Sequence, residues 1–276
     1  MMKNLAPYRK VMAIVNATPD SFYALSRAEG EEAVAHRVAE VVAQGADIVD
    51  IGGYSTRPGA VEVSVEEELR RVLSAVEQAR RVAPEVQISV DTFRSEVAEA
   101  VLSRWGNIII NDITAGQADG RMVDVVAHWG APMVAMHTKG TTIGGVRSMH
   151  APVEYADVVA EVGDYLARRA EWLTSKGIEE VIIDPGFGFA KNVEQNFELM
   201  RGVDKIAALG HPVLVGISRK SFIYKSLGTQ PDDNTTLAAT TALHWEALCG
   251  GAAVLRVHDV AEARATVDMF EKTHRL

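Results

Sequence analysis

The chain has 276 residues, of which 47% are hydrophobic and 24% charged. This balance excludes a disordered polar tail and provides enough apolar side chains for a large core. The formal net charge of -9 argues against a general nucleic-acid binder, whose binding face would be basic.

A single cysteine, Cys249, excludes a disulfide scaffold and a cysteine-based zinc site, and it is typical of a reducing compartment. The segment Met1 to Lys10 lacks the apolar stretch of a signal peptide. No apolar run reaches the roughly 18 residues of a membrane span. We therefore expect a cytoplasmic protein.

Eight short runs rich in valine and isoleucine recur along the chain. Each run is apolar almost throughout, which predicts strands covered on both faces, as in a parallel sheet. Helical periodicity fills the gaps, most clearly over 66–82 and 155–173. The eight predicted strands are 11–17, 47–53, 87–92, 107–113, 132–137, 181–185, 213–218 and 252–258.

Glycines punctuate this pattern, because one stands just before six of the eight runs. Such glycines predict left-handed turns that end a helix and lead into a strand. Ser64 and Glu67 predict a capping box at the start of one helix. The six glycines are Gly45, Gly106, Gly130, Gly177, Gly210 and Gly250.

The repeated strand and helix predict an α/β fold, namely a parallel (β/α)8 TIM barrel that forms a single domain over 1–276. A doubly wound open sheet is the alternative. In a barrel the carboxyl ends of the strands form one mouth, where catalytic residues gather. Each apolar run does end in polar residues, although any single Asp or Asn could instead cap the following helix.

The polar residues at the strand ends divide into two chemical sets. Carboxylate, amide and ammonium groups offer donors and acceptors to a flat heterocycle, and Asp184 suits an edge with adjacent N–H and amino donors. Phe187 and Phe189 could flank such a planar ligand. The residues of this first set are Asp91, Asn111, Asp184 and Lys220.

The second set is cationic and indicates a phosphate or diphosphate group, because arginine presents a planar fork to phosphate oxygens. A salt bridge with a nearby carboxylate is the alternative for any one arginine. Asn16 could supply an oxygen to a magnesium ion, which takes few protein ligands. The cationic residues are Arg57, Arg219, Lys220, Arg256 and His258.

Together the strand-end motifs resemble, in order and over nearly the whole chain, those of the dihydropteroate synthases of folate biosynthesis. The motifs are Asn16–Phe22, Gly52–Ala60, Ser89–Thr92, Asn111–Ile113, Met136–His137, Asp184–Phe189, Ser218–Ser221 and Arg256–Asp259. The resemblance implies a transferase that joins 6-hydroxymethyl-7,8-dihydropterin diphosphate to 4-aminobenzoate, giving 7,8-dihydropteroate and diphosphate. It also implies a homodimer.

The resemblance assigns roles to individual residues. The pterin is held by the first polar set, with Arg256 against its face, while Asn16, Arg256 and His258 bind the diphosphate with Mg²⁺. Thr56 and Arg57 close over the diphosphate and aminobenzoate, and Asp20 joins them during reaction. The aminobenzoate pocket is lined by Phe22, Pro58 and Ser221. The expected catalytic residues are Asp20, Arg57, Asp184, Lys220 and Arg256.

Some positions depart from the family pattern. Tyr54 stands where the family commonly has Glu, Thr138 where Met is usual and Ala190 where Gly is usual, and 23–27 replaces an Asp-Gly-Gly sequence. Three other functions remain open. They are a pterin-binding methyltransferase that serves a corrinoid, a Schiff-base aldolase that uses Lys220, and a non-catalytic paralogue.

Overall fold

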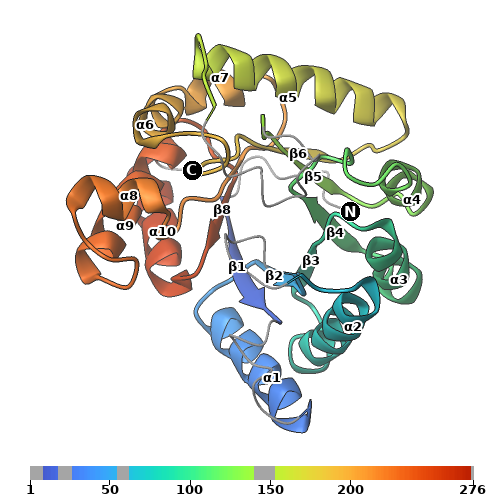
Figure 1. Cartoon of the computed structure of the whole chain (residues 1–276). Helices are drawn as coiled ribbons and strands as arrows, with labels where there is room; N and C mark the ends of the chain where they lie inside the picture. The colour runs from blue at the N-terminus through green and yellow to red at the C-terminus, as the bar shows by residue number, and fades with distance from the viewer. Residues whose placement is uncertain (1–8, 18–26, 55–61, 140–152, 275–276) are drawn as a thin grey trace.

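The computed structural model describes residues 9–17, 27–54, 62–139 and 153–274. Helices form a ring around the strands (Figure 1). The strands are β1 Lys10–Asn16, β2 Ile48–Gly52, β3 Gln87–Asp91, β4 Ile108–Asp112, β5 Met133–Met136, β6 Val181–Asp184, β7 Leu214–Val215 and β8 Val254–Val257. The helices are α1 Arg27–Ala43, α2 Val65–Val82, α3 Ser95–Trp105, α4 Met122–His128, α5 Val158–Ser175, α6 Val193–Arg201, α7 Val203–Ala207, α8 Ser221–Leu227, α9 Asn234–Cys249 and α10 Val260–His274.

The strands make one parallel sheet in the order β6-β5-β4-β3-β2-β1-β8-β7. A parallel bridge between Ile183 and Val213 joins β6 to β7 and closes the ring. The predicted (β/α)8 barrel is therefore confirmed, and the open sheet is excluded. All eight predicted runs contain a strand, although β7 is shorter than its predicted run.

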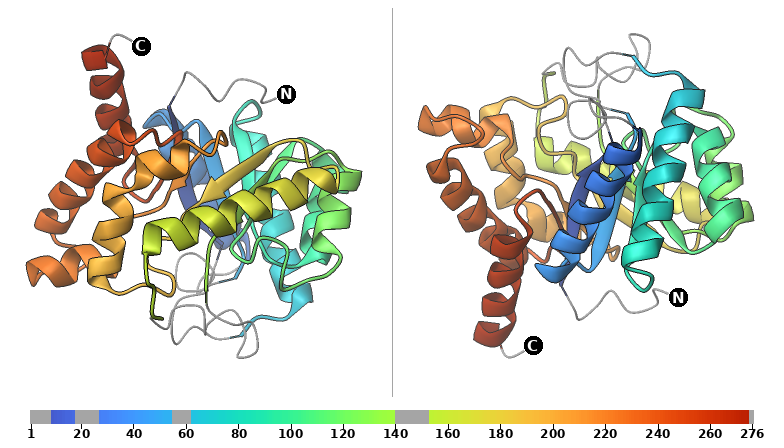
Figure 2. Two further views of the ribbon diagram at one scale, coloured as in Figure 1. Left: turned by 90° about the horizontal axis from the view of Figure 1, so that it is seen from above. Right: turned by 90° about the horizontal axis from the view of Figure 1, so that it is seen from below.

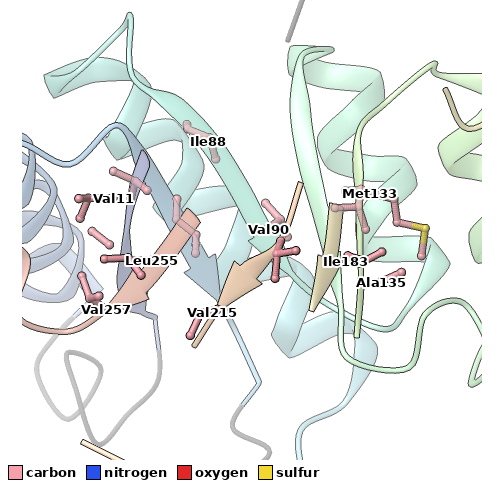
Figure 3. Packing of buried hydrophobic residues seen from close by; sticks show 14 of the residues in the cluster. Val11, Ile88, Val90, Met133, Ala135, Ile183, Val215, Leu255 and Val257 are labelled. Atoms are coloured by element: carbon pink, nitrogen blue, oxygen red, sulfur yellow. The ribbon is translucent and has the colours of Figure 1, made fainter. Parts of the chain in front are cut away.

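Alternation along each strand divides the apolar side chains into two layers. The outward layer packs beneath the helices. Figure 3 shows side chains of this layer on their strands, among them Val90, Ile183 and Leu255. The left view of Figure 2 shows α5 lying alongside β6, with which it packs. The inward layer is a smaller buried cluster that fills the barrel interior, namely Met12, Ile48, Ile109, Val134, Ile182, Leu214 and Val254.

Five of the six glycines predicted to be left-handed do have positive φ. Gly250 does not, because its φ is -73° and the left-handed residue is Gly251, at 96°. The left-handed turn after α9 thus falls one residue later than predicted. Gly250 is nevertheless confined by packing, since a Cβ there would lie 2.8 Å from the Cβ of Val203.

The predicted capping box at the start of α2 is only half formed. The Ser64 hydroxyl accepts a hydrogen bond from the Glu67 backbone N–H at 3.2 Å. The Glu67 carboxylate instead accepts hydrogen bonds from Arg70 and Arg71, so it does not return to the cap. Within the described ranges, no helix is long and apolar enough to cross a bilayer.

Candidate active site

The polar layer of the barrel interior begins where the apolar floor ends. Inward positions recur every second residue along a strand, so the residue two places beyond a floor residue points into the same interior. Ile48, Ile109, Ile182 and Val254 of the floor are followed in this way by Asp50, Asn111, Asp184 and Arg256. Because side chains alternate with a period of two residues, polar groups from separate strands meet in the barrel interior, directly above the apolar floor.

Arg256 lies at the centre of this layer between two carboxylates. Its Nε donates to Asp50 Oδ2 at 2.6 Å, and its Nη2 donates to Asp91 Oδ2 at 2.7 Å. Asn111 Nδ2 donates to the same Asp50 oxygen at 3.1 Å. Burial alone would lower the pKa of Arg256, but Asp50 and Asp91 outweigh it and raise that pKa. The guanidinium is therefore permanently charged.

Asp184 ends β6 and is held by its own loop. Its Oδ1 accepts a hydrogen bond from the Gly186 backbone N–H at 2.7 Å. Burial raises the pKa of Asp184, while Lys220, the Gly186 N–H and Arg256 act in the opposite direction. Asp184 and Arg256 each lie two places beyond a floor residue, so both side chains point into the same interior space.

Lys220 faces the same loop from the end of β7. Its ammonium donates to the Phe187 carbonyl and lies 4.8 Å from the centre of the Phe189 ring. Burial lowers the pKa of Lys220 to about 8, although Asp184 acts to raise it. Phe189 packs with an apolar group at the mouth that consists of Tyr54, Phe93, Ile113 and Met136.

Lys191 fastens the loop that follows β6. Its ammonium contacts the carbonyls of Gly186 and Phe189 at 3.0 and 3.1 Å and the His137 Nδ1 at 3.1 Å. Burial lowers the pKa of His137 to about 3, and so the ring is neutral and can accept. Burial also lowers the pKa of Lys191 to about 7, against the pull of Asp184.

Two contacts join the loops after β7 and β8. The Ser218 hydroxyl lies 3.1 Å from the His258 backbone N, which donates to it, and 3.2 Å from His258 Nδ1. Arg219 makes a two-point ion pair with Asp259, with distances of 2.8 and 2.9 Å. The alternative of a salt bridge is therefore observed for Arg219, and also for Arg256 with Asp50 and Asp91, although the sequence had placed both arginines among the phosphate-binding cations.

The structure thus brings together most of the described residues that were predicted to form a site. Ser221 is the first residue of α8 and is exposed. Asn16 ends β1 beside Gly52, where a Cβ would lie 3.8 Å from Asn16 Oδ1 and 3.6 Å from Asp91 Cβ. The predicted site residues that lie outside the described residues are Asp20, Phe22, Thr56, Arg57 and Pro58.

Two residues of this site had no predicted role. Asp50 is a carboxylate inside an apolar strand, and that exception to the pattern was the signal that could have singled it out. Lys191 follows the Asp184–Phe189 motif, but only the folded loop shows that its ammonium turns back onto the loop carbonyls.

Comparison with known proteins agrees with this geometry. The family model of pterin binding enzymes matches residues 12–258. A dihydropteroate synthase of Synechocystis sp. is 40% identical over 259 residues, which cover 93% of this chain and 87% of the relative. A structure of Xanthomonas albilineans dihydropteroate synthase with 4-aminobenzoic acid has a TM-score of 0.85 and 38% identity, covering 98% of this chain and 94% of the other. The Thermus thermophilus enzyme in complex with 6HMPPP has a TM-score of 0.80 and 38% identity, covering 98% and 95%.

The barrel and the polar layer at its mouth define a (β/α)8 enzyme whose site suits a planar, charged ligand. The chain belongs to the dihydropteroate synthases, a family of pterin-binding enzymes. The predicted family and the predicted transferase of folate synthesis are thereby confirmed.

Proposed function

We propose that this chain condenses 6-hydroxymethyl-7,8-dihydropterin diphosphate with 4-aminobenzoate and that diphosphate leaves before the amine attacks. The observation that carries the proposal is the interior layer in which Asp91, Asn111, Asp184 and Arg256 meet above an apolar floor. The relatives solved with 4-aminobenzoic acid and with 6HMPPP support the two substrates.

The pterin ring lies in the polar layer. Asp184 accepts from adjacent ring N–H and amino groups, because its Oδ2 is not used by the Gly186 N–H that holds Oδ1. Asn111 and Asp91 meet further ring groups, and Lys220 donates to a ring acceptor. The Phe189 ring and the Arg256 guanidinium provide flat surfaces on which a planar ligand stacks.

The diphosphate extends toward the mouth, where Arg256 and His258 stabilise its charge as the C–O bond breaks. Asn16 offers one amide oxygen at this rim. Among the described residues no group of three or more His, Cys, Asp or Glu side chains could hold a metal. A magnesium ion held by Asn16 and by substrate oxygens fits this donor set, since magnesium takes few protein ligands. When bound, it would supply positive charge opposite the leaving diphosphate.

Departure of diphosphate leaves a pterin-methylene cation. The ionised Asp184 stabilises positive charge spread over the ring, which favours this SN1-like order. The lone pair of the aminobenzoate nitrogen then forms the new C–N bond with this cation, and the resulting arylammonium loses its proton to water. No strong general base is needed, because the amine attacks an electrophile that has already formed. The roles of Asp20, Phe22, Thr56, Arg57, Pro58 and Ser221 around the second substrate remain predictions.

The resemblance to the family also supports a homodimer, and the single cysteine supports a cytoplasmic location. Analytical ultracentrifugation of the purified chain tests the proposed homodimer. A particle with the mass of one chain across the working concentration range would contradict it.

A coupled assay of diphosphate release, with and without 4-aminobenzoate, tests the proposed reaction. We expect diphosphate and dihydropteroate in equal amounts when both substrates are present. Methyl transfer without diphosphate release would favour the corrinoid methyltransferase. Borohydride trapping of substrate on Lys220 would favour the aldolase, and a folded but inactive chain would favour the non-catalytic paralogue.

A further inference from the structure

Asp50 is a charged side chain at the centre of β2 with no solvent exposure. Its Oδ2 accepts from both Arg256 Nε and Asn111 Nδ2, at 2.6 and 3.1 Å. Its Oδ1 is buried and has no hydrogen-bond partner among the described residues. A carboxylate that is buried at this energetic cost and contacts two proposed pterin ligands calls for a reason beyond packing.

We propose that Asp50 is a positioning residue that fixes the orientation of Asn111 and Arg256 and thereby sets which hydrogen-bonding groups the barrel floor presents to the pterin. Asp50 itself does not contact the substrate in this proposal. The inference rests on the proposed function, because it assigns the pterin to the layer that Asp50 supports.

The orientation of the Asn111 amide follows from the chemistry of its partner. An ionised carboxylate can only accept hydrogen bonds, so Asn111 must turn its NH₂ group toward Asp50. The amide oxygen of Asn111 is then left for the ligand. Asp50 therefore makes Asn111 an acceptor, which selects a ring N–H or amino group and rejects a ring acceptor at that point.

The register of the strands shows how Asp50 supports Arg256. Asp50 pairs with Ser89 of β3, whereas Gly52, two residues further along β2, pairs with Asp91. Asp50 is therefore one inward position deeper than Asp91. The Arg256 guanidinium passes Asp50 and reaches Asp91, and its two bonds to these carboxylates come from different nitrogens.

This difference in depth has a consequence for binding. Asp91 lies nearer the mouth and is 25% exposed, while Asp50 is fully buried. Donors of an incoming pterin can replace the Arg256 Nη2 at Asp91. The bond from Nε to Asp50 is out of reach of the ligand, so it retains Arg256 in place while Asp91 changes partner.

The test is Asp50→Asn in the full-length chain, because an amide keeps the size of Asp50 but offers donors as well as an acceptor and carries no charge. It therefore no longer forces Asn111 to turn its oxygen toward the ligand or holds the Arg256 guanidinium by charge. We expect the KM and the calorimetric Kd for the pterin diphosphate to rise about 10- to 100-fold, the range found when a group that orients a metal-binding side chain is removed. The KM for 4-aminobenzoate should change less than about 2-fold. Equal increases in both KM values, or an unchanged pterin KM, would overturn the inference.

Asp112→Asn is the matched control. Asp112 is also fully buried, at the end of β4, but its carboxylate accepts from Thr114 and Gly116 within its own loop. Loss of the Asp112 carboxylate should lower the stability of the fold without raising the KM for the pterin diphosphate more than the KM for 4-aminobenzoate. If Asp112→Asn raises the pterin KM as selectively as Asp50→Asn, the effect is a general one of losing a buried carboxylate and the inference fails.

A double-mutant cycle with Asn111→Ser distinguishes action through Asn111 from a direct contact. We expect the effect of Asp50→Asn on pterin Kd to be smaller in the Asn111→Ser background, and full additivity would contradict the inference. If Asp50→Asn does not fold, Asp50→Ser takes its place in the same assays. An inactive wild-type chain would refute the proposed function instead, so the two failures are distinct.

Discussion

Asp91 and Lys220 are oppositely charged groups whose pKa values burial moves toward neutral pH. Burial raises the pKa of Asp91 to about 7, with Arg256 opposing the shift and Asp50, Glu68 and Asp112 adding to it. Burial lowers the pKa of Lys220 to about 8. The Asp184 carboxylate acts to raise this pKa, and the Arg256 guanidinium acts to lower it further. The proposed site needs Asp91 ionised as an acceptor and Lys220 protonated as a donor.

The expected result is a bell-shaped dependence of kcat/KM for the pterin diphosphate on pH. Activity should rise through about pH 7 as Asp91 loses its proton and fall through about pH 8 as Lys220 loses its own. Fixed-time assays from about pH 5 to about pH 10 check this, because this range extends about two pH units beyond each of the two pKa values. Asp91→Asn should move the acid limb to a different pH and leave the alkaline limb in place, and an unchanged acid limb in this variant would assign it to another group, such as Asp184, whose pKa burial also raises.

Asp184 provides a second prediction at the level of a single residue. Asp184→Asn keeps an oxygen for the Gly186 N–H but replaces the ionised acceptor, so the protein should fold and bind pterin weakly. A hydrogen bond to a charged group contributes about 1.5–3 kcal/mol, which corresponds to roughly a 10- to 100-fold higher Kd. Calorimetry with the pterin diphosphate measures this Kd. Wild-type affinity in the folded variant would contradict the role of Asp184.

The loop between β6 and α6 holds both Asp184 and Phe189 in place, and its backbone is constrained. Gly186 and Gly188 have φ of 71° and 78°, and Ala190 adopts 50°. Ala190 therefore carries a left-handed conformation that costs an L-residue about 1–2 kcal/mol. Lys191 compensates by hydrogen-bonding two carbonyls of this loop.

Gly186→Ala tests how closely this loop approaches β5. A Cβ at Gly186 would lie 2.0 Å from the His137 carbonyl oxygen, so the backbone must move. Gly210→Ala is the matched control, because its φ of 84° is equally left-handed but a Cβ there meets nothing within 4 Å. We expect Gly210→Ala to lower the free energy of unfolding by about 1 kcal/mol and Gly186→Ala by about 3 kcal/mol or more.

Urea unfolding measures the free energy of unfolding of both variants. The affinity for the pterin diphosphate is then measured by calorimetry on each variant that folds. Gly186→Ala should also weaken pterin binding, because the Gly186 N–H orients Asp184. Equal losses of stability in the two variants would show that conformational strain, and not the contact with His137, decides the cost.

Helices and strands could be predicted from the sequence where they depend on neighbouring residues, and less well where they depend on residues distant in sequence. The strands and α2 were predictable because their apolar periodicity is local. The predicted helix over 155–173 is displaced, since Asp157 caps α5 and the helix begins at Val158. The run 213–218 is strand only at Leu214–Val215, because strand pairing depends on neighbours that are distant in sequence.

The same reasoning applies to the site. Asp91, Asn111, Asp184 and Arg256 could be predicted to meet because parallel strands end together. The pairing of Arg256 with Asp50 joins residues 206 positions apart, and no local pattern indicates it. The ion pair of Arg219 with Asp259 is hidden in the same way, because a motif cannot show which partner a cation meets.

At the scale of the whole molecule, the barrel is closed unevenly. Strands β1 and β2 pair over Met12 to Asn16, whereas β7 pairs with β8 only at Leu214 and Val215. A single bridge, Ile183 to Val213, joins β6 to β7. The proposed pterin site lies across this weak junction, because Asp184 ends β6 and Lys220 follows β7.

Hydrogen exchange measured by mass spectrometry tests whether the barrel opens more easily at the weakly paired strand β7 than at β2. Local opening needs less free energy where fewer hydrogen bonds and packed strands hold the backbone. We expect amides of 213–217 to exchange before those of 48–52, which lie between two fully paired neighbours. The pterin diphosphate should slow exchange most over 181–191 and 213–221, because Asp184 and Lys220 bind it from opposite sides of the junction. Slowed exchange confined to β2 and β3 would place the ligand elsewhere in the barrel and would separate Lys220 from the pterin.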